Sequence, residues 1–251
     1  MSNILRPQPG PQEKFVNLMA GVAGEEEKEE DFYLVFYGGA AGGGKSFSLL
    51  FDVLKYVDCP EFYGVFFRKT LKQLERTLWK EAKKMYRPFL VGEDGSFIGK
   101  ACIKEQAKKI VFPSGATVEF SYLDSDATTE ENWQGAELTG AFFDEYTHFS
   151  KFAFNYVGTR MRSNSKYNSF IRCSMNPHPT HFVHEYVDIF IDQNTGFAID
   201  ELSGKPAYYI VKDNVVLTSF NKEKLEEENP GYDAIKYTFI PSKLEDNKEM
   251  L

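Results

Sequence analysis

The chain contains Gly39-Ala40-Ala41-Gly42-Gly43-Gly44-Lys45-Ser46, which has the G-x-x-x-x-G-K-S spacing of a phosphate-binding P-loop. The apolar run 32–37 before it has the length and the aromatic and β-branched content of a buried strand. After it, Phe47, Leu50 and Leu54 repeat at helical spacing. The order strand, glycine turn, helix distinguishes a P-loop from an incidental glycine-rich loop, so we predict a P-loop here.

A P-loop binds phosphate mainly through its backbone. Glycines allow several N–H groups to point inward, and the N-terminus of the next helix adds unpaired donors and a positive dipole end. We expect Lys45 to reach the β- and γ-phosphates of ATP and the Ser46 hydroxyl to ligate Mg²⁺. The predicted nucleotide-binding residues of this segment are Gly39, Ala40, Ala41, Gly42, Gly43, Gly44, Lys45, Ser46 and Phe47.

A second motif lies about 100 residues downstream of the loop. The hydrophobic run 138–143 is typical of a strand, and it ends in Asp144 and Glu145. In P-loop ATPases an acidic residue at this position holds Mg²⁺, usually through water, and we assign that role to Asp144. Glu145 points to the other side of the strand end and can polarise the attacking water as general base.

Gln12 and two arginines are further candidates. The Gln12 amide can both donate to and accept from an adenine edge, although a plain surface glutamine fits the same position. We predict a helix over 149–162 that ends at Arg160 and Arg162. Either arginine could act as a finger toward a γ-phosphate of its own or a neighbouring subunit. A helix C-terminus also favours cations without any catalytic role.

A further strand begins at Ser169 and leads to Ser174 and Asn176. Both side chains could hydrogen-bond a γ-phosphate and respond to its loss. His181 and His184 follow shortly after, but they lack a carboxylate or cysteine partner at the usual ligand spacing. We therefore predict no zinc site.

Length and composition narrow the class of protein. The 251 residues suffice for one sizeable core, and 42% hydrophobic with 26% charged residues is typical of a soluble globular protein. No apolar run approaches the ~20 residues that span a bilayer, and no signal peptide is evident. Three widely separated cysteines fit a reducing compartment. The net charge of −8 gives no general support for nucleic-acid binding.

One segment departs from this acidic balance. We predict a single long helix over 68–87, with eight basic residues against the two acids Glu75 and Glu81. Such a face could contact DNA phosphates or a neighbouring subunit, or it could simply be solvated. The basic residues are Arg68, Lys69, Lys72, Arg76, Lys80, Lys83, Lys84 and Arg87.

The predicted elements suggest a domain organisation. We expect an ATPase core over 1–196, interrupted by a β-hairpin insertion at about 100–123 that turns at 113–115. Residues 124–134 are polar and loop-like. The remaining 197–251 are too few for an independent enzyme domain, and we predict a lid or linker subdomain.

With these motifs in place, the chain resembles the ATPase portion of a tailed-phage terminase large subunit, the DNA-packaging motor. The resemblance covers nearly the whole length. It rests on the P-loop together with more specific segments, which are the Arg6–Gln12 lead, Phe66-Phe67-Arg68-Lys69-Thr70, Trp133-Gln134-Gly135, Phe143-Asp144-Glu145, Arg160-Met161-Arg162, Ser174-Met175-Asn176-Pro177-His178-Pro179 and Thr238–Asn247.

The resemblance implies an α/β fold, namely the three-layer, additional-strand (ASCE, RecA-like) P-loop type with a mostly parallel central sheet. It implies Mg²⁺-dependent ATP hydrolysis that moves double-stranded DNA into a procapsid. The implied partners are DNA, the portal protein on which the motor forms a ring, and the terminase small subunit. The isolated chain would be a monomer in the host cytoplasm, without membrane contact. Gln12 matches the adenine-side glutamine, and Ser174–Asn176 matches the coupling motif.

Two departures from the family pattern stand out. Many members carry an arginine inside the P-loop, where this chain has Ala40-Ala41, so its finger must come from elsewhere. Full-length members also carry a C-terminal nuclease, and too little sequence follows Asn247 to form one. We therefore expect a shortened form, one product of a split gene or a motor-only variant, with no DNA cleavage by this chain alone.

Three other functions fit parts of the pattern. A helicase-type DNA-dependent ATPase would share the acidic pair and the glutamine, but it needs a second RecA-like domain. A P-loop kinase of a small metabolite would need an acceptor rather than DNA. A non-enzymatic assembly module would bind ATP without turnover.

Overall fold

The computed structural model describes residues 6–39, 44–176, 178–243 and 246. Its strands are β1 (Leu34–Gly39), β2 (Tyr63–Arg68), β3 (Cys102–Lys104), β4 (Lys109–Val111), β5 (Thr117–Tyr122), β6 (Gly140–Phe143), β7 (Phe170–Met175), β8 (Ala207–Lys212), β9 (Val215–Ser219) and β10 (Ile235–Ser242). Its α-helices are α1 (Pro11–Asn17), α2 (Lys45–Asp52), α3 (Leu71–Leu74), α4 (Lys80–Leu90), α5 (Asp126–Trp133), α6 (Lys151–Gly158), α7 (His184–Val187) and α8 (Lys222–Glu228).

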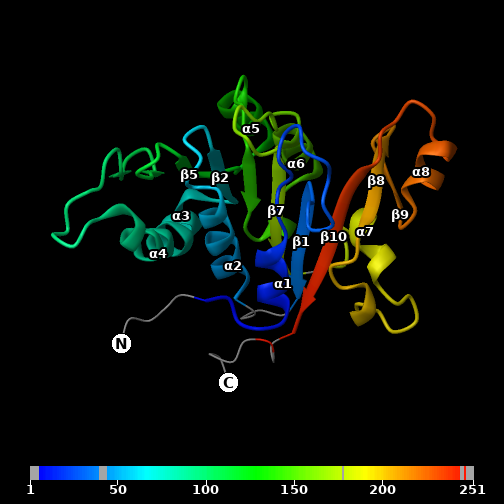
Figure 1. Cartoon of the computed structure of the whole chain (residues 1–251). Helices are drawn as coiled ribbons and strands as arrows, with labels where there is room; N and C mark the ends of the chain where they lie inside the picture. The colour runs from blue at the N-terminus through cyan, green and yellow to red at the C-terminus, as the bar shows by residue number, and fades with distance from the viewer. Residues whose placement is uncertain (1–5, 40–43, 177, 244–245, 247–251) are drawn as a thin grey trace.

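The strands form one sheet in the order β3-β4-β5-β2-β6-β7-β1-β10-β8-β9 (Figure 1). The six central strands, from β5 to β10 in this order, are parallel to one another. The outer strands β3, β4, β8 and β9 extend the two edges in antiparallel pairing. β7 lies between β1, which leads into the P-loop, and β6, which ends at the acidic pair. This inserted strand confirms the predicted α/β fold of the additional-strand type with a mostly parallel sheet.

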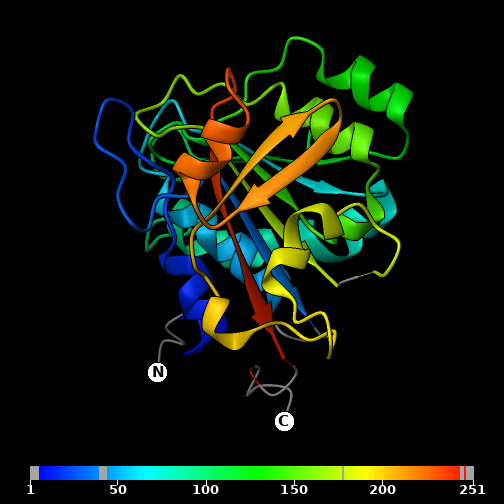
Figure 2. The ribbon, with the colours of Figure 1, turned by 90° about the vertical axis from the view of Figure 1, so that its right-hand side faces the viewer.

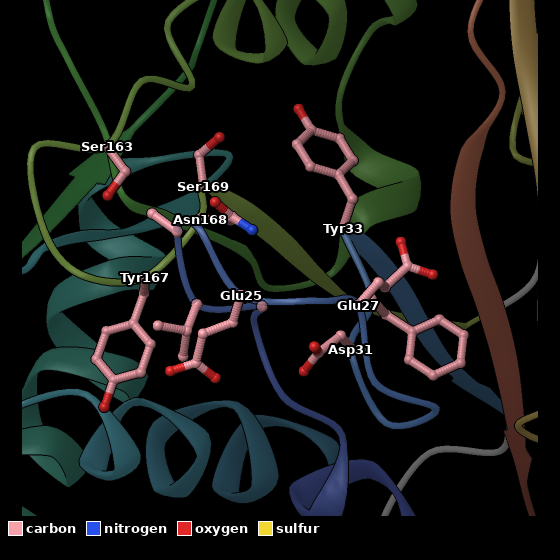
Figure 3. A pocket seen from close by; sticks show the side chains of 12 residues that line it. Glu25, Glu27, Asp31, Tyr33, Ser163, Tyr167, Asn168 and Ser169 are labelled. Carbon is pink, nitrogen blue, oxygen red and sulfur yellow. The ribbon is translucent and has the colours of Figure 1, made fainter.

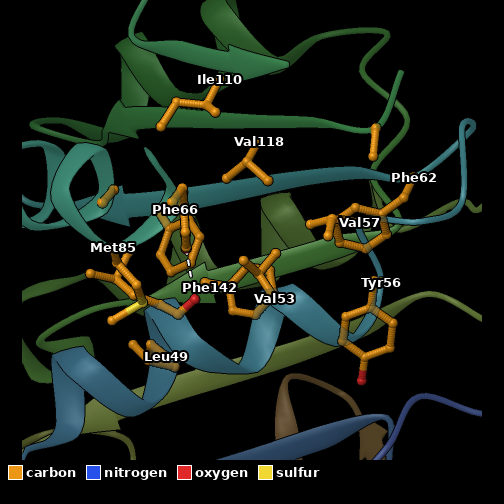
Figure 4. Packing of buried hydrophobic residues seen from close by; sticks show 14 of the residues in the cluster. Leu49, Val53, Tyr56, Val57, Phe62, Phe66, Met85, Ile110, Val118 and Phe142 are labelled. Carbon is orange, nitrogen blue, oxygen red and sulfur yellow. Dashed lines mark hydrogen bonds between the residues drawn. The ribbon is translucent and has the colours of Figure 1, made fainter. Parts of the chain in front are cut away.

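Apolar side chains fill both faces of the sheet because successive residues of a strand point to opposite sides. Val35 of β1 packs in the layer beneath α1, α2, α3 and α4, whereas Phe36 packs in the layer beneath α5, α6 and α7. Figure 4 shows part of the first layer, a buried cluster to which Leu49 of α2 and Phe66 and Phe142 of the sheet belong. The P-loop helix thereby packs in the same buried layer as Phe142 of β6, the strand that ends at the acidic pair. Among the described helices, none has both the length and the apolar character needed to cross a membrane.

The segment 197–251, predicted as a lid or linker, supplies β8, β9 and β10 to the same sheet, and Figure 2 shows the β8–β9 hairpin beside α8. β10 runs parallel to β1 along the whole length of β1, ending at the pair Gly39↔Ser242. The hairpin turns at Asp213 and Asn214, whose φ angles of 52° and 63° are those of a tight two-residue turn. The boundary after residue 196 stays a prediction, but β10 is part of the core sheet.

The predicted long helix over 68–87 is wrong at its start. Arg68 is the last residue of β2, and the helix begins at Leu71, after Thr70, whose hydroxyl caps its first turn. The helical run continues through a π-helical turn over Glu75–Trp79 into α4. The regular spacing of the basic residues therefore hid the end of strand β2 in the sequence.

Two other local predictions had different outcomes. The loop predicted over 124–134 is wrong, because it contains α5, and the Ser125 hydroxyl accepts a hydrogen bond from the Thr128 N–H at its start. The hairpin predicted across 113–115 is confirmed by the antiparallel pairing of β4 and β5. β5 also pairs with β2, so the insertion extends the main sheet.

A buried charge cluster holds the N-terminal lead against this core. Asp52 lies between Lys55 (Nζ to Oδ1 2.5 Å) and Arg172 of β7 (Nε to Oδ2 3.7 Å). The Arg172 guanidinium also donates to the main-chain oxygens of Met19 and Phe32. Buried charges are tolerated when they are paired, and the hydrogen bonds from Arg172 to Met19 and Phe32 hold the segment that follows Gln12 against β7.

We predict that Gly39→Ala lowers the free energy of unfolding by about 1–3 kcal/mol. Gly39 has φ +146°, and a Cβ there would lie 1.7 Å from the carbonyl oxygen of Ser242 in β10. Gly158→Ala in α6 is the matched control, because a Cβ there meets nothing within 4 Å, and alanine favours a helix over glycine. Denaturant unfolding of both variants checks this; equal stability of Gly39→Ala and wild type would contradict the close β1–β10 contact.

Candidate nucleotide-binding site

Both ends of the P-loop require glycine. Gly44 precedes α2 in the left-handed region, with φ +69°, and a Cβ on it would lie 2.4 Å from Gln12 Nε2. A side chain at position 39 would clash with the carbonyl oxygen of Ser242. The four predicted residues between them, Ala40, Ala41, Gly42 and Gly43, lie outside the described residues. The loop therefore starts and ends at two positions where the backbone needs glycine.

Asp144 joins three elements at the carboxyl edge of the sheet. It follows β6 and is only 1% exposed. Its Oδ1 accepts hydrogen bonds from Ser46 Oγ (2.9 Å) and Ser174 Oγ (2.5 Å). Its Oδ2 accepts one from Arg68 Nε at 2.7 Å and lies 2.6 Å from a second guanidinium nitrogen. The structure thus brings together Ser46, Asp144 and Ser174, three of the predicted site residues.

Glu145 has a different environment from its neighbour. Its φ and ψ of 58° and 55° are unusual for a residue with a side chain, and such backbone is frequent at functional sites. Its N–H donates to Ser174 Oγ at 3.2 Å. Its carboxylate is 37% exposed and lies 3.3 Å from the Arg68 guanidinium and 3.5 Å from His148 Nε2. The turn directs Asp144 inward and leaves Glu145 facing the open side.

Lys45 lies at the first turn of α2, between the loop and the acids. Its Nζ donates to the carbonyl oxygen of Gly39 at 3.2 Å. Burial lowers the pKa of Lys45, and the charges of Glu145 and Asp144 oppose that shift. The ammonium group is therefore within the electrostatic field of both carboxylates, where a bound phosphate would offer it a stronger partner.

The other predicted nucleotide-binding residues lie around this centre. Gln12 is 3% exposed and packs beside Gly44, and its Oε1 accepts a hydrogen bond from the Gln8 N–H at 3.1 Å. Phe47 stacks on Phe51 with ring centres 5.8 Å apart. Asn176 is exposed just beyond β7. Their contact with a nucleotide stays a prediction.

Arg160 and Arg162 lie at the opposite end of the sheet. Their main-chain atoms hydrogen-bond with Leu138, which precedes β6, whereas Asp144 follows that strand. From Leu138 to Asp144 the chain extends for about 20 Å at ~3.3 Å per residue. Arg160 also stacks over the Tyr156 ring, 5.2 Å from its centre. Neither arginine reaches the P-loop of its own chain, so the finger role stays a prediction for a neighbouring subunit only.

Arg68 was not among the predicted site residues. It is 7% exposed, and its guanidinium contacts both Asp144 and Glu145. A signal was present in the sequence, because Arg68 directly follows the apolar run 62–67. The carboxyl ends of parallel strands meet at one edge of a sheet, so a cation ending one strand can pair with acids ending the next.

His181 and His184 each contact an oxygen atom of a nearby residue. His181 Nε2 lies 2.9 Å from the Phe149 carbonyl oxygen, and burial lowers the pKa of His181. His184 Nδ1 lies 2.6 Å from Asp188 Oδ1. In the part of the chain that the structure describes, no group of three or more His, Cys, Asp or Glu side chains could hold a metal ion.

A cavity of about 470 Å³ lies at the other edge of the sheet, at the amino ends of β1 and β7 (Figure 3). Its acidic residues are Glu25, Glu27 and Asp31, and Tyr33 and Ser169 lie beside them. Carboxylates repel a triphosphate, and the P-loop lies at the opposite edge. This cavity is therefore not the nucleotide site.

The centre around Asp144 fits Mg²⁺ and a triphosphate. A hydroxyl and carboxylates are the oxygen donors that Mg²⁺ prefers. The N-terminus of α2 and the Lys45 ammonium supply the positive groups that phosphates need. The 2.9 Å hydrogen bond between Ser46 and Asp144 places the two predicted Mg²⁺ ligands side by side.

Comparison with known proteins identifies relatives of this chain. A family model described as terminase large subunit, T4likevirus-type, N-terminal, matches residues 36–249. The structure of a large terminase from a thermophilic bacteriophage is similar, with a TM-score of 0.59 and 18% identity over 96% of this chain and 47% of that chain. A second structure of that terminase, in complex with ATP-γ-S, has a TM-score of 0.58 at 18% identity, over 97% of this chain and 46% of that chain.

The chain spans about half the length of that thermophilic-phage terminase. No curated protein sequence matches the chain. At this level of identity the structural similarity shows a shared fold, and the family is shown by the sequence model, which covers most of the chain. The chain therefore belongs to the terminase large subunit family, as an N-terminal domain of the T4likevirus type.

Proposed function

We propose that this chain is a Mg²⁺-dependent ATP hydrolase that drives DNA packaging in a phage. The observation that carries the proposal is the convergence of Ser46 and Asp144 at the N-terminus of α2, beside Glu145. The thermophilic-phage terminase, which shares this fold over the matched region, has been solved with ATP-γ-S and with ADP. Both complexes support nucleotide binding by the present chain.

The residues of the site divide the work of hydrolysis. Lys45 and the first N–H groups of α2 bind and orient the β- and γ-phosphates. Ser46 and Asp144 would hold Mg²⁺, which would neutralise charge that develops on the phosphate oxygens. Glu145, on the open side, positions the attacking water and accepts its proton. Ser174 donates to Asp144 and accepts from the Glu145 N–H, so β7 is coupled to both acids.

The proposed assembly is a ring on the portal protein, with double-stranded DNA and the small terminase subunit as partners, in the host cytoplasm. The far position of Arg160 and Arg162 favours a finger supplied to the next subunit rather than to their own P-loop. For the DNA contact we propose the face of α3, the π-helical turn and α4 that exposes Lys72, Arg76, Lys80 and Lys84. Phosphate contacts of this type need no base-specific geometry.

We predict that Glu145→Ala binds ATP with near wild-type affinity but hydrolyses it about 10²–10⁴-fold more slowly, the usual contribution of a general base. Lys45→Ala should lose both binding and turnover, because its ammonium group contacts the phosphates in the ground state and in the transition state. Fluorescent-nucleotide binding and phosphate release measure the two effects. Normal turnover by Glu145→Ala would show that another group is the base.

We predict that double-stranded DNA stimulates ATP turnover by the pure protein, whereas a small-metabolite kinase would respond only to an acceptor. The triple variant K72E/R76E/K80E should bind DNA more weakly and show a shallower dependence of affinity on salt, because fewer counterions are released. K222E/K224E on the exposed face of α8 is the control, since these lysines lie on another element. Equal DNA affinity and stimulation in the triple variant would exclude this face.

A further inference from the structure

Arg68 contacts Asp144, the carboxylate to which the proposed function assigns Mg²⁺ binding. Two of its guanidinium nitrogens lie 2.7 Å and 2.6 Å from Asp144 Oδ2, and a third lies 3.3 Å from Glu145 Oε1. Charge-assisted contacts of this kind between guanidinium and carboxylate are among the strongest polar interactions in proteins. Both acids thus share one buried cation that the chain itself supplies.

The remaining oxygen of Asp144 is also engaged, because Oδ1 accepts from Ser46 and Ser174. A carboxylate that holds a hydrated Mg²⁺ must direct an oxygen at that shell. Arginine stays protonated in proteins, so Arg68 cannot make room by losing its charge. Two cations around one buried carboxylate repel each other strongly, because little water screens them.

We propose that Arg68 is a resident counter-cation that gives up Asp144 when Mg·ATP binds and stays beside Glu145. It is a positioning residue, and the inference rests on the proposed function. Glu145 supports this exchange because it is the more exposed acid and already contacts the guanidinium. The guanidinium therefore keeps one anionic partner while it releases the other. Without nucleotide, the same pairing offsets part of the negative charge of the acid pair and orders both carboxylates.

The exchange connects the nucleotide site to the proposed DNA face. Arg68 ends β2, and Thr70, two residues later, caps α3 by accepting a hydrogen bond from the Gln73 N–H at 3.3 Å. The helix then passes through the π-helical turn over Glu75–Trp79, a feature that often marks functional sites. A shift of Arg68 away from Asp144 is thus passed along two residues of main chain to the helix that carries Lys72 and Arg76.

The test compares Arg68→Gln, Arg68→Lys and the wild-type chain, with Arg87→Gln as control on the exposed side of α4. One measurement is the Mg²⁺ concentration that gives half-maximal binding of a fluorescent ATP analogue. We expect this concentration to fall by about tenfold or more in Arg68→Gln, because Mg²⁺ then has no guanidinium to displace from Asp144. A coupling free energy of this size is ordinary. Arg68→Lys should lie between Arg68→Gln and the wild type, and Arg87→Gln should match the wild type.

A second measurement, the melting temperature with and without Mg²⁺ and no nucleotide, is independent of turnover. Arg68→Gln should melt at a lower temperature than the wild type without metal, because a buried carboxylate loses its partner. Mg²⁺ alone should stabilise this variant more than the wild type. A purely structural role would lower the melting temperature without changing the Mg²⁺ dependence.

The outcomes distinguish the counter-cation role of Arg68 from the proposed function of the chain. If the wild type binds Mg·nucleotide and both Arg68 variants need the same or a higher Mg²⁺ concentration for half-maximal binding, the counter-cation role alone is overturned. If Arg68→Gln does not fold, Arg68→Lys decides the question by the same two measurements. A wild type that binds no Mg·nucleotide overturns the proposed function and this inference with it.

Discussion

The site depends on the hydrogen bonds and the ion pair made by the buried carboxylate of Asp144. This carboxylate takes hydrogen bonds from α2 and β7 and an ion pair from β2, although Ser46 and Asp144 are 98 residues apart in the sequence. A buried charge is costly unless all its lone pairs are used, so these partners must be in place together. Their convergence requires the strand order β2-β6-β7-β1, in which all four strands are parallel and end at one edge.

The two apolar layers hold that edge in register. β6 has only four residues, and all of them are buried, so side-chain packing above and below positions it as much as its hydrogen bonds do. The Asp144 N–H donates to the Phe67 carbonyl oxygen at 3.0 Å, which ties the acid to the neighbouring strand β2. The left-handed turn at Glu145 then sends the two adjacent carboxylates to different environments. The buried position of Asp144 and the exposed position of Glu145 fit their proposed roles, an inner acid for the metal and an outer acid for water.

The parts of the site that the sequence predicted were those with a local pattern. Gly39 to Ser46 carries its own spacing, and Asp144 and Ser174 each end an apolar run, so their meeting at one sheet edge follows from parallel strands. Arg68 also ends such a run, but the basic helix after it obscured that signal. The pairing of β10 with β1 joins residues about 200 positions apart, and nothing in the composition of 235–242 specifies its partner. Long-range pairing of this kind is decided by the packing of the whole sheet.

The most direct measurement of the central claim is an experimental structure of the protein with Mg²⁺ and ATP-γ-S. We expect the terminal phosphates at the N-terminus of α2, with the metal ion bonded to Ser46 Oγ and linked through water to Asp144, and with the Arg68 guanidinium withdrawn from Asp144 Oδ2. A nucleotide bound elsewhere, or a metal ion that contacts neither Ser46 nor the hydration shell beside Asp144, would contradict it.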